Sequence, residues 1–147
     1  TMADYKLWNA LKDAKKYRWV ELSHALNNES PYWSGIPKGS VELAKTVWDW
    51  GKPELECLIQ TFKFPGQFGT HIDFPGHFIK GKALSEKFDV NDLIFPLVVI
   101  VLDNDKLQVE GLANLDKVQP AGAVVIVSYP RIEGATGLPA RVWAITE

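Results

Sequence analysis

The chain has 147 residues, of which 46% are hydrophobic and 23% charged, and its formal net charge is −2. This length and composition are typical of one soluble globular domain with its own core, and we assign residues 1–147 to a single domain. A net charge near zero argues against a nucleic-acid-binding protein or one that binds anionic membranes. The single cysteine, Cys57, excludes an intrachain disulfide and a cysteine-based zinc site.

The sequence also lacks an apolar run of the roughly 20 residues that a membrane-spanning helix needs. Its first residues carry charges throughout and have no apolar core typical of a signal peptide. We therefore expect a cytoplasmic protein. A threonine precedes Met2, so the removal of a native leader peptide stays an open alternative.

Hydrophobic periodicity predicts a helix and then a strand at the start of the chain. Residues 4–17 repeat their apolar side chains at helical spacing, and Asp4 stands where an N-cap would lie. Residues 18–22 are expected to form a short strand, and 23–31, rich in turn formers, a loop. Residues 41–50 show no clear period and are assigned no element.

From residue 54 onward the pattern favours strands. We expect them at 54–64, 94–102, 107–112, 121–129 and 140–145, with a short helix or turn within 84–93. The runs 94–102 and 121–129 are almost entirely apolar, which predicts fully buried strands. The result is a strand-rich α/β domain with few helices.

Residues 67–77 hold the densest set of metal-ligating side chains. Two of the three histidines, His71 and His77, lie there, with Asp73 between them. An extended backbone would place His71 and Asp73 on the same side of the chain, where imidazole nitrogen and carboxylate oxygen suit a divalent metal. His77 is then the natural proton carrier for a metal-activated water. The alternative is that Thr70, His71 and Asp73 only satisfy the backbone of a buried loop.

Four further residues could take part in a site or serve the structure alone. Glu110 interrupts an otherwise apolar strand, so an inward carboxylate there would need a cation or strong donors. Tyr32 and Trp33 lie on an irregular segment and are either core residues or pocket walls. His24, alone in a loop, is expected to be a capping or surface histidine.

The string Gly69-Thr70-His71-x-Asp73-x-Pro75-x-His77 resembles the signature of the metal-dependent cyclase family, which includes bacterial kynurenine formamidases (arylformamidases) and isatin hydrolases. The resemblance continues at 21–26, 30–33, 112–118 and 137–142, and so covers most of the chain. It implies a swivelling β/β/α domain, assembled as a homo-dimer or homo-tetramer. It also implies hydrolysis of an amide or cyclic amide by water that a divalent metal, zinc or manganese, activates.

Carried over position by position, the resemblance makes His71, Asp73 and Glu110 metal ligands and His77 the general acid/base. Trp33 matches an aromatic residue that contacts substrate, and we expect Tyr32 and Phe74 to stack beside it. Gln67 stands where the family signature opens with a histidine ligand, so it would be a weak ligand through its amide oxygen.

The chain departs from the family in length as well. Family members carry a substantial segment between the strand ending near Leu102 and the strand that holds Glu110, and here only residues 103–107 join them. Either the chain has an internal deletion or residues between the two strands are missing from this sequence. The rival to a small-molecule hydrolase is therefore a catalytically inactive family remnant that binds a small ligand or a metal.

Overall fold

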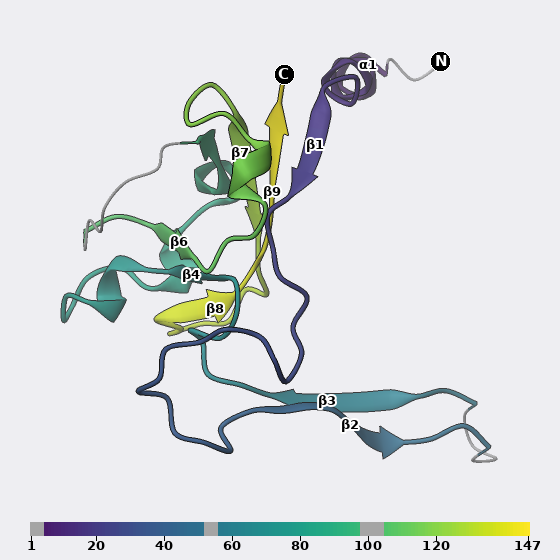
Figure 1. Ribbon diagram of the computed structural model, residues 1–147, viewed down its shortest axis with the longest axis vertical. Helices are drawn as coiled ribbons and strands as arrows, with labels where there is room; N and C mark the ends of the chain where they lie inside the picture. Colours follow the sequence, from purple (N-terminus) through teal and green to yellow (C-terminus); the bar gives the residue numbers. More distant parts are fainter. Residues whose placement is uncertain (1–4, 52–55, 98–104) are drawn as a thin grey trace.

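The computed structural model describes residues 5–51, 56–97 and 105–147 (Figure 1). Within these ranges the chain forms one α-helix, four short 3-10 helices and nine strands, which pair into sheets of four, three and two strands. The predicted strand-rich α/β domain is confirmed. No helix in the described ranges is long and apolar enough to cross a membrane.

The four-stranded sheet carries most of the core. Its order is β1 (Arg18–Glu21), β9 (Arg141–Thr146), β7 (Val124–Ser128) and β5 (Ile94–Pro96), and every neighbouring pair is antiparallel. Burial alternates along β7 and β9, because one face of the sheet packs inward and the other does not. The inward face contributes Val20, Val125, Val127, Val142 and Ala144 to the hydrophobic core.

Two predicted strands are less buried than expected. β5 covers only Ile94–Pro96, and Ile94 is 54% exposed because β5 is the edge strand of its sheet. The rest of the predicted strand 94–102, apart from the buried Leu97, lies outside the described residues. In the predicted strand 121–129, β7 keeps one face partly exposed rather than being buried on both.

The three-stranded sheet has β4 (His71–Asp73) at its centre, between β6 (Gln108–Glu110) and β8 (Gly137–Pro139). Both pairings are antiparallel, and all three residues of β4 are buried. Ile72 points its side chain to the core, so the neighbouring His71 and Asp73 must point to the opposite face. β6 falls within the strand predicted at 107–112, and β4 has the extended backbone on which the shared face of His71 and Asp73 depended. β8 was not predicted as a separate strand.

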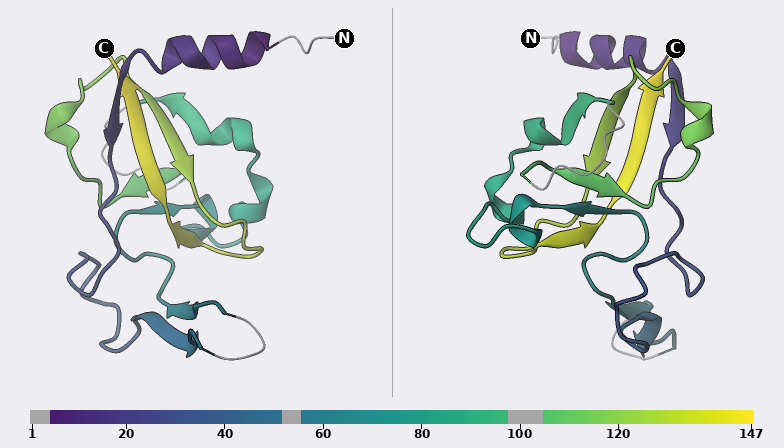
Figure 2. Two further views of the ribbon diagram at one scale, coloured as in Figure 1. Left: turned by 90° about the vertical axis from the view of Figure 1, so that its right-hand side faces the viewer. Right: turned by 60° about the vertical axis from the view of Figure 1, so that its left-hand side comes forward.

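The two-stranded sheet is a hairpin of β2 (Glu42–Trp48) and β3 (Ile59–Lys63), which projects from the rest of the molecule (Figures 1 and 2). The prediction gave no element to residues 41–50, and β3 is shorter than the strand expected at 54–64. All five residues of β3 are exposed. Since neither face of the hairpin is buried in the chain, burial imposes no alternating pattern on β2.

The α-helix, α1 (Lys6–Ala14), lies at the end of the molecule opposite the hairpin (Figure 2). It is shorter than the predicted 4–17, and none of its residues is buried. The predicted N-cap, Asp4, lies outside the described residues; the N-cap is Tyr5, which makes no capping bond through its side chain. The 3-10 helices are η1 (Pro75–His77), η2 (Ser85–Lys87), η3 (Val90–Leu93) and η4 (Leu115–Lys117).

Candidate metal centre

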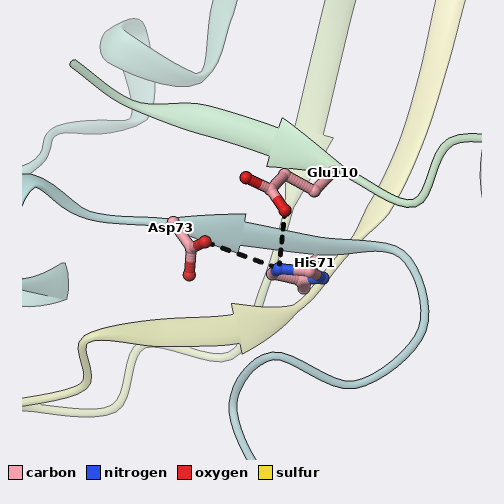
Figure 3. Close-up of side chains that lie close together, drawn as sticks. All are labelled: His71, Asp73 and Glu110. Carbon is pink, nitrogen blue, oxygen red and sulfur yellow. Dashed lines mark ion pairs between the residues drawn. The ribbon is translucent and has the colours of Figure 1, made fainter. Parts of the chain in front are cut away.

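The register of the three-stranded sheet gathers the candidate ligands on one face. His71 lies opposite Glu110 on β6, and Asp73 lies opposite Gln108 on the same strand. Directly opposed residues of antiparallel strands project to the same side. His71, Asp73 and Glu110 therefore share a face, as Figure 3 shows.

The three side chains are close enough to hold one ion. His71 Nε2 is 3.5 Å from Asp73 Oδ2 and 3.8 Å from Glu110 Oε2. One ligand atom from each residue lies within 4.8 Å of the others. Ligands about 2.1 Å from a tetrahedral zinc are about 3.4 Å apart, so small side-chain movements would complete such a site. This donor set, one imidazole nitrogen and two carboxylates, fits a divalent metal.

His71 is held in the tautomer that a ligand through Nε2 requires. Its Nδ1 lies 2.9 Å from the carbonyl oxygen of Gly69, which can only accept a hydrogen bond, so Nδ1 carries the proton. Nε2 is left facing the two carboxylates. Burial lowers the pKa of His71, but the hydrogen bonds with Asp73 and Gly69 and the negative charges of Asp73 and Glu110 outweigh it, and the net pKa is raised.

Gln67 reaches the site through its amide nitrogen. Gln67 Nε2 donates to Asp73 Oδ1 at 3.0 Å and lies 3.5 Å from His77 Nδ1. The Gln67 amide and the Asp73 carboxylate both lie over Gly137, where a Cβ would be 2.2 Å from Gln67 Nε2 and 2.4 Å from Asp73 Oδ1. Gly137 is therefore the gap on β8 into which the amide and the carboxylate fit. This orientation differs from the expected ligand role of Gln67, since an amide nitrogen has no lone pair for a metal.

Thr70 fastens the strand that carries His71 to the end of β6. Its hydroxyl donates to the carbonyl oxygen of Gly111 at 2.6 Å and accepts from the backbone N–H of His24 at 2.9 Å. Gly111, next to Glu110, has φ 64°, and a Cβ there would lie 2.7 Å from the Gly69 carbonyl oxygen. The loop-architecture interpretation is thus correct for Thr70, while His71 and Asp73 point their side chains at each other.

A cavity of about 610 Å³ opens over the three-stranded sheet. It brings together most of the predicted site residues, and its walls include Tyr32, Trp33, Gln67, His71, His77 and Glu110. His77 ends η1, where its ring packs edge-on against Phe78 with centroids 4.4 Å apart. Trp33 is 73% exposed, and Tyr32 packs against the buried Phe68 with ring centroids 5.6 Å apart.

Phe74 does not belong to this cavity. Its side chain is fully buried in the core, with ring centroids 5.5 Å from Phe88 and 5.3 Å from Tyr129. The expectation that Phe74 stacks on a substrate was wrong, because the same period of two that aims His71 and Asp73 at the ligand face aims Ile72 and Phe74 at the core. Phe74 instead supports the site from below as a core residue.

Gln108 was not predicted as a site residue. It lies opposite Asp73 on the ligand face of the sheet and is 8% exposed, and its Nε2 has no hydrogen-bond partner within the described ranges. An unpaired buried donor beside a carboxylate is consistent with a site that takes a polar ligand. The sequence signal was its position two residues before Glu110, which places both side chains on one face of a strand.

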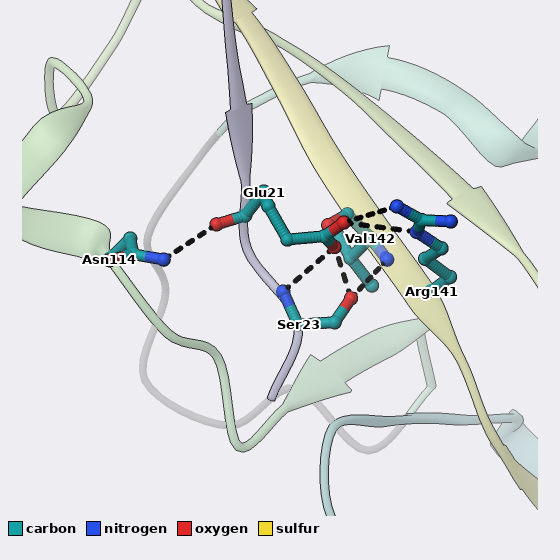
Figure 4. A network of polar contacts seen from close by, with 5 residues as sticks. All are labelled: Glu21, Ser23, Asn114, Arg141 and Val142. Atoms are coloured by element: carbon teal, nitrogen blue, oxygen red, sulfur yellow. Dashed lines mark hydrogen bonds and ion pairs between the residues drawn. The ribbon is translucent and has the colours of Figure 1, made fainter. Parts of the chain in front are cut away.

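A second cavity, of about 670 Å³, is lined by Glu21, Ser23, His24 and Arg141 among others. Its charges are already paired, since Arg141 donates through Nε and Nη2 to Glu21 Oε2 at 3.0 and 2.8 Å (Figure 4). Burial raises the pKa of Glu21, but the hydrogen bonds from Arg141 and Ser23 outweigh it and leave the pKa lowered. We therefore place the site in the smaller cavity. His24 is exposed, as a surface histidine should be.

The comparisons with known proteins agree with the fold and the motif. Residues 20–130 match the model of the family described as "Putative cyclase". The chain belongs to this family. No curated protein sequence matches the chain.

Solved structures of cyclase-fold enzymes superpose on nearly the whole chain. Isatin hydrolase A from Labrenzia aggregata, bound to benzyl benzoate, has a TM-score of 0.77 at 16% identity, covering 96% of this chain and 99% of that one. An isatin hydrolase bound to the product analogue thioisatinate gives 0.75 at 17% identity, covering 99% of each chain. A potential metal-dependent hydrolase with cyclase activity gives 0.63 at 13% identity, covering 88% of this chain and 98% of that one. At these identities the likeness shows the fold, and the expected cyclase-type fold is confirmed.

Proposed function

We propose that the protein is a metal-dependent hydrolase that opens an amide or cyclic amide bond of a small aromatic substrate, as an arylformamidase does. The observation that carries this proposal is the convergence of His71, Asp73 and Glu110 at the wall of a cavity that also holds His77. Membership of the cyclase family and the likeness to isatin hydrolases support it.

His71, Asp73 and Glu110 would hold a divalent ion, for which zinc and manganese are the leading candidates because both accept mixed nitrogen and oxygen ligands. When bound, such an ion acts as a Lewis acid and lowers the pKa of a coordinated water toward neutrality. His71 and Asp73 are almost completely buried, which favours ion binding over solvation of these side chains.

Amide hydrolysis requires that a proton leaves the attacking water and that the leaving nitrogen gains one. His77 is the residue we assign to this transfer, because it is the remaining histidine of the cavity wall and its ring is exposed to the cavity. Tyr32 and Trp33 form the aromatic part of the wall and would pack against a flat substrate. Phe74 has no part in the proposed contact with substrate.

The proposal includes assembly into a homo-dimer or homo-tetramer, with a small-molecule substrate and no nucleic-acid or membrane partner. Large apolar side chains stand exposed on α1 and on the hairpin; Leu7 is 89%, Trp50 64% and Phe62 58% exposed. Light scattering coupled to size-exclusion chromatography would measure the mass of the assembly, and a monomer at micromolar concentration would contradict this part. A cytoplasmic location stays a prediction, which fractionation of cells that produce the native protein would test.

The deciding experiment combines metal analysis with hydrolysis assays. Purified protein is expected to contain about one equivalent of zinc or manganese, to lose activity with a chelator and to regain it with metal, using N-formylkynurenine and isatin as substrates. His77→Ala is expected to abolish turnover and to keep its metal. Full-length protein that binds no metal and hydrolyses neither substrate would instead support the rival interpretation, an inactive family member.

A further inference from the structure

Gln67 is fixed above the three-stranded sheet by the backbone on both sides of it. The preceding residue, Gly66, approaches β8 so closely that a Cβ there would lie 2.1 Å from the carbonyl oxygen of Gly137. The following residue, Phe68, is 1% exposed and forms a bridge with Tyr32. Gln67 therefore has little freedom, and its amide enters the space that the missing side chain of Gly137 leaves.

The chemistry of its partner decides which way the amide faces. Asp73 Oδ1 lies 3.0 Å from the end of the Gln67 side chain, and an ionised carboxylate can only accept hydrogen bonds. The amide oxygen in that place would set two acceptors against each other, so the nitrogen must be the atom that faces Asp73. The same nitrogen carries a second hydrogen, and His77 Nδ1 lies 3.5 Å from it.

We propose that Gln67 is a positioning residue that donates one amide hydrogen to Asp73 and the other to His77 Nδ1, and so holds neutral His77 with its proton on Nε2. A ring nitrogen that accepts a hydrogen bond cannot carry the proton of the neutral imidazole, so the proton must reside on the other nitrogen. His77 then offers the cavity an N–H donor. Asp73, fixed through Oδ1, keeps Oδ2 towards His71 Nε2.

This arrangement gives the two histidines of the cavity opposite tautomers. His71 carries its proton on Nδ1 because Gly69 accepts it, and His77 carries its proton on Nε2 because Gln67 donates to Nδ1. In this tautomer His77 donates a hydrogen bond to a substrate atom through Nε2, and it takes up the proton of the attacking water only at Nδ1, once that nitrogen is released from Gln67. The catalytic meaning of this tautomer rests on the proposed hydrolase function, whereas the tautomer itself does not.

The test is long-range proton–nitrogen NMR of the histidine rings in zinc-loaded protein, at a pH where His77 is neutral. The chain has three histidines, so three ring patterns are expected. Wild type should show His77 with its proton on Nε2. Gln67→Glu replaces the amide donor with an acceptor and should move that proton to Nδ1, while Gln60→Glu, the same change on the exposed strand β3, should leave the His77 pattern unchanged.

A wild-type His77 that carries its proton on Nδ1 would overturn the proposal, and so would a Gln67→Glu pattern identical to that of wild type. If Gln67→Glu fails to fold, the wild-type spectrum still decides. The kinetic readout uses Gln67→Leu, which should lower kcat by about 10- to 100-fold, as removal of a partner of a metal ligand typically does, with a smaller change in KM. An inactive wild type showing the expected tautomers would refute the hydrolase function and leave the role of Gln67 intact.

Discussion

Replacing Thr70 with valine should destabilise the fold strongly, although the two side chains have nearly the same shape. Thr70 is 1% exposed, and its hydroxyl bonds the carbonyl of Gly111 and the N–H of His24. Valine leaves both backbone groups without this partner. Each unsatisfied buried group costs about 1–3 kcal/mol, and His24 is near solvent and can regain a water, so we expect a loss of about 2–4 kcal/mol. That is a large part of the 5–15 kcal/mol by which domains are usually stable.

Urea unfolding followed by tryptophan fluorescence measures this loss, with Thr61→Val as the matched control. Thr61 lies on the exposed strand β3, and its hydroxyl makes one long bond of 3.4 Å to the Lys45 carbonyl, so its replacement should cost about 0.5 kcal/mol or less. Thr70→Val should also weaken zinc binding, because the Thr70–Gly111 bond holds the end of the strand that carries Glu110. Equal losses for the two variants would refute the reasoning.

Three further outcomes are expected. Phe74→Ala should lower the free energy of unfolding in urea by about 3–5 kcal/mol, because Phe74 is a buried core residue. Phe62→Ala on the exposed hairpin should lower it by about 0.5 kcal/mol or less. Similar losses for the two variants would place Phe74 outside the core. Gln108→Leu should raise the stability of the metal-free fold by about 1 kcal/mol, since it removes a buried amide nitrogen that has no partner among the described residues; a loss of stability above 1 kcal/mol would reveal a partner. Zinc affinity, measured by calorimetry across pH, should fall as the pH drops through the raised pKa of His71, because protons then compete with zinc for Nε2. In the metal-free protein the raised pKa of His71 stabilises the fold fully at a pH below the ordinary histidine pKa. This stabilisation is lost as the pH rises through the raised pKa. A zinc affinity independent of pH would contradict Nε2 ligation.

The candidate ligands could be singled out from the sequence, in part by local rules and in part by the resemblance to the cyclase family. His71 and Asp73 are two residues apart in an extended segment, so their side chains had to share a face, and the structure brings them together. Glu110 was singled out because a carboxylate in an apolar strand needs compensation, and it is the residue opposite His71. The first inference depends on spacing within one strand and the second on the cost of burying a carboxylate, and the resemblance to the cyclase family joined the three residues into one set.

The misses share a different cause. Gln67 was predicted to bind a metal through its amide oxygen. Only its position over Gly137 and beside Asp73 shows that its amide nitrogen faces the site. Gln108 shares a strand face with Glu110, which its spacing indicates, but its place opposite Asp73 depends on the pairing of β4 with β6. The strand β2 was missed because its residues are exposed on both faces of a projecting hairpin, so no burial requirement shapes their order.

The order in which the chain supplies the three-stranded sheet has a consequence for synthesis. The central strand β4 ends at residue 73, while its two neighbours come from residues 108–110 and 137–139. A nascent chain that has exposed β4 alone presents a histidine and an aspartate without the opposing carboxylate of Glu110 or the gap at Gly137. Closing these loops costs entropy that is recovered only when all three strands pair. The three candidate ligands are complete only once residue 110 has been made, and the gap at Gly137 only close to residue 147, so any metal capture during synthesis should be a late event.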